Sequence, residues 1–139
     1  MALQTTVERV DARVPVTVVT LEGELDASNY EHLVDEVRGL YEAGSRQLVL
    51  DLGGLTFMAS SGLVALHSIV QVMHGQPPPD PEMGWAAFHA MGRAVEESGT
   101  QTEVRLCAVQ PSVERVLGRT GLDHLFVMYP DRASAIAAV

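Results

Sequence analysis

One stretch, residues 48–66 (LVLDLGGLTFMASSGLVAL), constrains the fold more than any other part of the chain. It opens with an apolar run that only Asp51 interrupts, which is typical of a strand covered on both faces. The two glycines at 53–54 provide the freedom for a turn, after which Ser60 or Ser61 can cap a helix. That helix is indicated by apolar residues at helical spacing, namely Leu63, Leu66, Ile69, Val70 and Met73. A serine hydroxyl at such a helix start lies where a phosphate is also stabilised.

Strand and helix patterns alternate along the rest of the chain. Apolar and β-branched runs predict strands at 3–10, 14–21, 48–52, 103–109 and 125–129, with the first at an edge of the sheet. Helical spacing predicts helices at 27–41, 60–73, 85–98, 111–119 and 131–139. Asp26, Ser28 or Asn29 can cap the first helix, and Gly44 can close it in a left-handed conformation.

This alternation predicts an α/β fold in which a mixed, largely parallel sheet is covered by helices. We expect one domain over residues 1–139, because a chain of this length buries a single core. Four prolines within 76–82 interrupt the pattern, so we expect a proline-rich and helical insertion at about 76–102. Sites in such sheets lie at the carboxyl ends of strands, which here would gather the loops 23–26 and 53–61.

The composition limits the classes of partner. A formal net charge of -9 opposes non-specific attraction to nucleic acid or to an anionic membrane surface, so we expect neither as a direct partner. No segment approaches the roughly 20 apolar residues of a membrane span, and the first residues lack the apolar core of a signal peptide. Cys107 is the only cysteine, which excludes an internal disulfide. We therefore expect a cytoplasmic protein.

Candidate catalytic and metal-binding groups are weak. His67 and His74 can share a helix face, but no cysteine or acidic ligand at suitable spacing completes a metal site. The glycines at 53–54 lack the lysine of a nucleotide-binding phosphate loop, and nothing marks a nucleophile elbow. We expect neither an enzyme nor a bound cofactor. On spacing alone, Asp26 is a cap or turn residue and the serine pair is a helix cap.

Three stretches resemble the STAS domain, the family of anti-sigma factor antagonists. They are GELD at 23–26, LDL at 50–52 with TFMASSGL at 56–63, and VERVL at 113–117 with TGL at 120–122. They occur in the family's order and span nearly the whole chain apart from about 76–102. The resemblance implies the family's α/β fold.

It also implies a function. In the family, the serine that follows a phenylalanine, a hydrophobic residue and an acid accepts a phosphate from an anti-sigma factor that is a serine kinase; here the matching residue is Ser60. The dephosphorylated protein binds that anti-sigma factor and frees the sigma factor, which regulates transcription, and the phosphorylated protein does not. The partner-binding positions that the resemblance implies are Asp26, Met58, Ala59, Ser60, Ser61 and Gly62. A homodimer is left open.

The sequence departs from the family pattern at two places. Family members commonly carry an aspartate before the acceptor serine, and here that residue is Ala59. The insertion at about 76–102 is longer than the usual link. These departures motivate an alternative function, a non-switching STAS scaffold or a small-ligand sensor that acts through the inserted segment.

Overall fold

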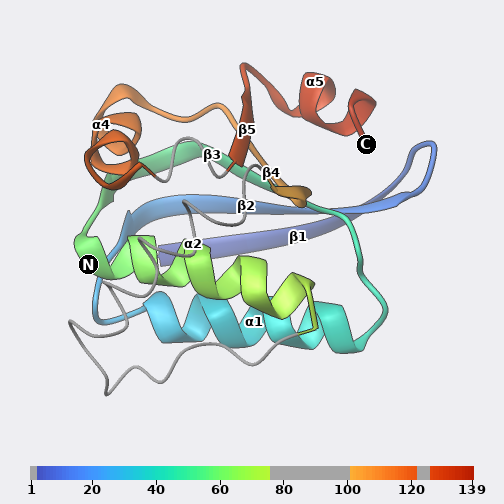
Figure 1. The fold of residues 1–139 in the computed structure, drawn as a ribbon, viewed down its shortest axis with the longest axis horizontal. Coiled ribbons are helices and arrows are strands. Elements are labelled where there is room, and N and C mark those ends of the chain that lie inside the picture. Colours follow the sequence, from blue (N-terminus) through green and yellow to red (C-terminus); the bar gives the residue numbers. More distant parts are fainter. Residues whose placement is uncertain (1–2, 76–100, 122–125) are drawn as a thin grey trace.

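The computed structural model describes residues 3–75, 101–121 and 126–139. Within these ranges one sheet contains β1 (Leu3–Asp11), β2 (Pro15–Leu25), β3 (Leu48–Met58), β4 (Gln101–Cys107) and β5 (Phe126–Tyr129), in that spatial order. β1 pairs antiparallel with β2, and the remaining pairs are parallel. The predicted mixed, largely parallel sheet with its first strand at an edge is therefore confirmed (Figure 1).

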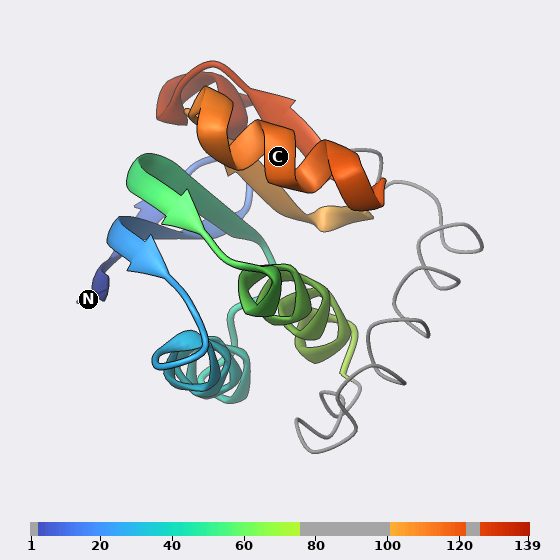
Figure 2. The same cartoon turned by 90° about the vertical axis from the view of Figure 1, so that its left-hand side faces the viewer.

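Helices cover both faces of this sheet. They are α1 (Tyr30–Glu42), α2 (Ser60–Met73), α4 (Pro111–Thr120) and α5 (Arg132–Ala137). α1, α2 and α4 contribute buried side chains to the larger core cluster, whereas α5 packs Ala135 in a smaller cluster on the opposite face (Figure 2). In β3, Leu48 and Leu50 belong to the first cluster and Val49 to the second, so this strand is covered on both faces as expected.

The end of α1 follows directly from the sequence. Gly44 has φ +111, and the amides of Gly44 and Ser45 donate to the carbonyls of Tyr41 and Leu40, at 3.0 Å each. This pair of bonds is the Schellman motif, which satisfies the last carbonyls of a helix and requires a left-handed residue after it. The prediction that Gly44 closes the helix is confirmed.

The predicted ends of two strands are wrong. β2 continues through Gly23 to Leu25, and β3 continues through its two glycines to Met58 without a turn. The pairing of β2 with β3 shifts register twice, so β3 carries extra residues there. Gly54 serves this close approach, because a Cβ at that position would lie 2.7 Å from Glu22 Cγ and 3.1 Å from the Leu21 carbonyl oxygen.

The predicted helix at 85–98 lies outside the described residues. So does the predicted insertion at about 76–102, except for its last two residues. Over the ranges that the structure describes, no helix has the length and apolar character needed to cross a membrane.

Candidate functional site

The carboxyl ends of β2 and β3 meet at one edge of the sheet. Leu25 pairs with Met58, and the amide of Ala59 donates to the Leu25 carbonyl at 2.9 Å. The loop after β2 leads into α1 and the residue after β3 leads into α2, so the two helix starts lie side by side (Figure 2). The structure thus brings the loop of Asp26 next to Ser60, although Asp26 and Ser60 are 34 residues apart in the sequence.

The interpretation of Ser60 or Ser61 as a helix cap is wrong. The N-cap of α2 is Ala59, with φ -80 and ψ 171, and no side chain caps this helix. Both serines already have helical positions, because β3 extends to Met58 and leaves a single residue before the helix. The Ser60 side chain is exposed and has no hydrogen-bond partner among the described residues. Its hydroxyl therefore has no local structural role there.

Ser61 differs from its neighbour. Its Oγ is buried and has no hydrogen-bond partner in the described part of the chain. Because a buried hydroxyl without a partner is unfavourable by about 1 to 3 kcal/mol, this position does not contribute a stabilising polar contact in this structure.

Gly62 allows the start of α2 to pack on the strand ends. A Cβ at this position would lie 2.5 Å from Met58 Cγ and 3.1 Å from Leu25 Cδ2. Met58 and Gly62 are buried, so they support the surface around Ser60 from below.

The loop of Asp26 is held by its own side chains. Asp26 Oδ1 accepts hydrogen bonds from the Ser28 hydroxyl at 2.5 Å and the Ser28 amide at 2.9 Å, and these bonds hold the pKa of the carboxyl below its ordinary value. Asn29 is the N-cap of α1, but its side chain accepts from the Asp26 amide and donates to the Glu24 carbonyl. The Asn29 side chain therefore stabilises the loop between β2 and α1 and does not make the expected side-chain cap of α1. A charged carboxylate remains at the site.

Sequence reasoning missed Phe57, whose ring is 49% exposed two residues before the N-cap of α2. Thr56 and Phe57 are both exposed, although Leu55 and Met58 on either side are buried. The second register shift explains this, because it leaves Thr56 as an extra residue between the paired Leu55 and Phe57. Strict alternation would have placed either Thr56 or Phe57 inside. The pair of glycines could have indicated an irregular strand, because glycines often mark a bulge, but it lies at the first register shift and does not point to Phe57.

α4 borders the site on the other side of β3. β4 pairs with β3 only over Leu48–Asp51, so among the described residues no strand pairs with the carboxyl half of β3 on the side away from β2. Two side chains from the start of α4 occupy its carbonyls instead. Gln110 Nε2 donates to the Gly53 carbonyl at 2.6 Å, and Ser112 Oγ donates to the Thr56 carbonyl at 3.2 Å.

The electrostatics of the α2 start favour an added anion. The first turn carries no acidic residue, and the amino end of a helix is positive. A phosphate on Ser60 would therefore be stabilised by the helix itself. The fold would not need to change to hold it.

The other candidate groups have structural surroundings. His67 is buried, which lowers its pKa, and His74 Nε2 lies 3.0 Å from Glu103 Oε2. Burial raises the pKa of the Cys107 thiol to about 11, so it stays protonated near neutral pH. Over the described ranges, no three His, Cys, Asp or Glu side chains are grouped to hold a metal ion.

Comparison with known proteins gives the family. A five-stranded sheet with one antiparallel edge, and a helix that starts at an exposed serine beside the β2–α1 loop, define an α/β module of the SpoIIAA-like type. The STAS domain matches residues 7–75 and 81–135, and this chain belongs to that family.

Three relatives illustrate the similarity. A Bordetella bronchiseptica protein named as an anti-sigma factor antagonist, BtrV, is 24% identical over 136 residues, covering 98% of this chain and 94% of its own. The crystal structure of an anti-sigma factor antagonist from Mycobacterium paratuberculosis has a TM-score of 0.67 and 27% identity, covering 99% of this chain and 94% of its own. The Bacillus cell fate determinant SpoIIAA in its phosphorylated form has a TM-score of 0.60 and 18% identity, covering 97% and 98%.

Proposed function

We propose that this protein is an anti-sigma factor antagonist that binds a serine-kinase anti-sigma factor and is switched by phosphorylation of Ser60. The observation that carries the proposal is the exposed Ser60 hydroxyl, which starts α2 without a hydrogen-bond partner in the described residues. A kinase can reach such a hydroxyl without breaking a contact of the fold. The names of the relatives support the class of partner.

The surface around Ser60 suits protein binding. Phe57 offers an exposed aromatic ring, and aromatic side chains are common anchors of interfaces. Asp26 and Ala59 lie beside it on the β2 and β3 ends, and the buried Met58 and Gly62 hold the helix start in place. The proposed contact surface therefore consists of Phe57, Ala59 and Ser60 with the Asp26 loop.

A phosphate at Ser60 can release the partner without unfolding the domain. It adds about -1.5 to -2 charges at neutral pH. The positive end of α2 stabilises such a charge by about 0.3 to 1 kcal/mol, whereas burying it in an interface without a matching cation costs several kcal/mol. Affinity for the partner falls and fold stability does not. SpoIIAA, whose fold is similar, has a structure in its phosphorylated form, which supports a fold of this type that holds a phosphate.

The first experiment is a pull-down from the native cell lysate with four baits. The baits are wild type, Ser60→Ala, Ser60→Asp and a control, Ala12→Asp, which adds one negative charge on the exposed β1–β2 hairpin at the other end of the sheet. We expect wild type, Ser60→Ala and the control to retain a kinase-like anti-sigma factor that Ser60→Asp loses. With the captured partner and ATP, intact-mass spectrometry should show a gain of one phosphate on wild type and none on Ser60→Ala.

Two results would contradict the proposal. If wild type and Ser60→Asp retain the same partners, Ser60 is not a switch. If the partner binds but adds no phosphate, the protein is a non-switching scaffold. Ala59, in place of the family's usual aspartate, would then explain why Ser60 is not phosphorylated. Melting temperatures of all four baits verify that each is folded.

A further inference from the structure

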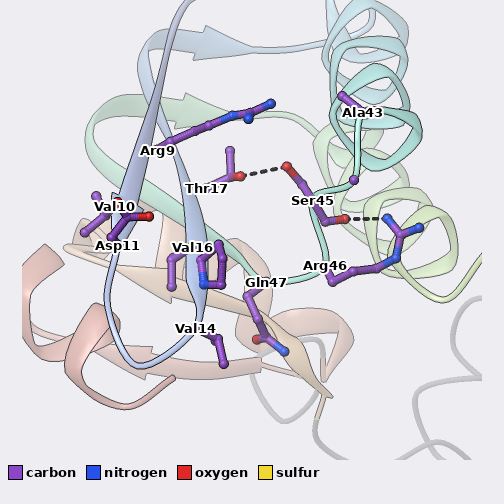
Figure 3. Close-up of a pocket in the computed structure, with 12 residues that line it drawn as sticks. Arg9, Val10, Asp11, Val14, Val16, Thr17, Ala43, Ser45, Arg46 and Gln47 are labelled. Carbon is purple, nitrogen blue, oxygen red and sulfur yellow. Dashed lines mark hydrogen bonds between the residues drawn. The ribbon is translucent and has the colours of Figure 1, made fainter.

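A pocket of about 540 Å³ lies at the end of the sheet away from Ser60. It is bounded by the β1–β2 hairpin, the start of β2 and the connection from α1 to β3 (Figure 3). Its residues come from the end of β1, the start of β2 and the connection that precedes β3, whereas the Ser60 surface is built at the carboxyl ends of β2 and β3. The volume falls within the range of about 300 to 1,000 Å³ that is usual for small-molecule sites.

Among the described residues, two arginines and a single carboxylate, that of Asp11, line this pocket in a protein whose net charge is -9. Arg46 donates to the carbonyls of Tyr41 at 2.7 Å and Ser45 at 2.9 Å, and its guanidinium lies 3.8 Å from the centre of the Tyr41 ring. These partners are neutral, so they orient the cation without cancelling its charge. Arg9 has no ion-pair partner among the described residues.

A partly buried pair of hydroxyl groups adds a donor to the pocket. Thr17 Oγ1 and Ser45 Oγ lie 2.7 Å apart, and Thr17 is only 4% exposed. Only one of their two hydroxyl protons can be used in this bond, and the other has no acceptor within the described residues. In Figure 3 the Arg9 side chain extends over this hydroxyl pair from β1. Cationic and hydroxyl donors thus converge on one place.

Part of the pocket wall is apolar. Val14 and Pro15 line it from the hairpin, and Val14 is 42% exposed beside the opening. A ligand with an anionic head and an apolar body would match both parts of this lining. A cation and a hydroxyl proton without an acceptor favour an anion, and exposed apolar surface favours a hydrocarbon chain.

We propose that this pocket binds a small organic anion, with its carboxylate or phosphate head on Arg9 and the Thr17–Ser45 pair and a short apolar tail along Val14 and Pro15. Arg46 lines the opposite wall of the pocket, and its guanidinium is held against Tyr41, away from the hydroxyl pair (Figure 3). This binding is independent of the switch at Ser60 and uses none of the residues proposed for the partner surface.

NMR titration of the ¹⁵N-labelled full chain tests the proposal. The probes are hexanoate and hexyl phosphate, the neutral 1-hexanol, and the tail-less acetate and inorganic phosphate. We expect at least one of the two hexyl anions to shift the amides of Thr17, Ser45 and Gln47 saturably, and to bind more tightly than its tail-less counterpart. Comparing hexanoate with hexyl phosphate identifies the preferred head group.

Two variants localise the interaction. Arg9→Gln should weaken binding about tenfold or more, because hydrogen bonds to charged groups contribute that much. Arg119→Gln removes the same charge from an exposed position on α4 and should leave binding unchanged. Thr17→Val, which keeps the shape of the buried side chain, should also weaken binding.

Three results would overturn the proposal. The first is a lack of saturable shifts at the three pocket amides with both hexyl anions up to about 10 mM, a range that covers even weak binding. The second is equal binding of 1-hexanol and the anions. The third is an equal effect of Arg9→Gln and Arg119→Gln, which would show that only the overall charge matters. Equal affinity of inorganic phosphate and hexyl phosphate would remove the apolar tail from the proposal.

Discussion

Replacing Ala59 by aspartate should stabilise the protein. Ala59 is the N-cap of α2, with an extended backbone conformation, and its methyl group cannot accept a hydrogen bond. An aspartate carboxylate there can accept from the amide of Ser61, which has the N2 position of the helix, whereas the Gly62 amide at N3 already donates to the Ala59 carbonyl at 2.9 Å. It also adds the acidic group that the first turn lacks.

The expected gain follows from these two contributions. Exchanging alanine for a good N-cap residue is worth about 1 kcal/mol, and a negative charge at a helix start adds about 0.3 to 1 kcal/mol. The carboxylate of Asp26 on the neighbouring loop opposes the second contribution by repulsion. We therefore expect a gain of about 1 to 1.5 kcal/mol in the free energy of unfolding. For 139 residues this corresponds to about 3 to 7 °C in melting temperature.

Thermal unfolding of wild type, Ala59→Asp and Ala59→Asn at several pH values measures the gain. The asparagine caps without a charge, so its gain should persist at acidic pH. The bonds that the cap accepts lower the pKa of the aspartate in the folded state. Its extra stability should thus be complete above the unfolded pKa of about 3.9 and be lost as pH falls through the folded value. If both variants melt at the wild-type temperature, Ala59 is not the N-cap and the account of the α2 start is wrong.

Three further outcomes are expected. Gly54→Ala should lower the free energy of unfolding by about 1 to 3 kcal/mol in urea, because its Cβ meets the rigid Leu21 carbonyl. Gly39→Ala, on α1 with nothing within 4 Å of the new Cβ, is its control and should stabilise by about 0.5 to 1 kcal/mol; a loss at both positions would contradict the steric cause. The Cys107 thiol should resist a thiol reagent at pH 8 in the native protein and react in urea, whereas rapid native labelling would show that it is accessible. Because the pKa of this thiol is raised in the folded state, stability should also fall as pH rises above 9.0, the ordinary thiol pKa.

The candidate site could be located from the sequence but not described from it. The motif around Ser60 predicted a serine at a helix start beside the Asp26 loop, and the structure places the two segments together. It did not predict that Ala59 is the cap, because the position of a cap depends on where the preceding strand ends. That end depends on how far β2 pairs with β3. The exposure of Phe57 and the burial of the Ser61 oxygen depend on the same pairing.

The sequence by itself determined the order of strands and helices, the faces they bury and the end of α1 at Gly44, because apolar spacing and backbone preference are local properties. Only the tertiary structure decided how far β2 and β3 extend past their glycines, since a neighbouring strand supplies the hydrogen bonds that keep them extended. It also decided that Arg9 and Arg46 line one pocket. These arginines are far apart in the chain, and no local pattern records which distant side chains the packing of a sheet brings together.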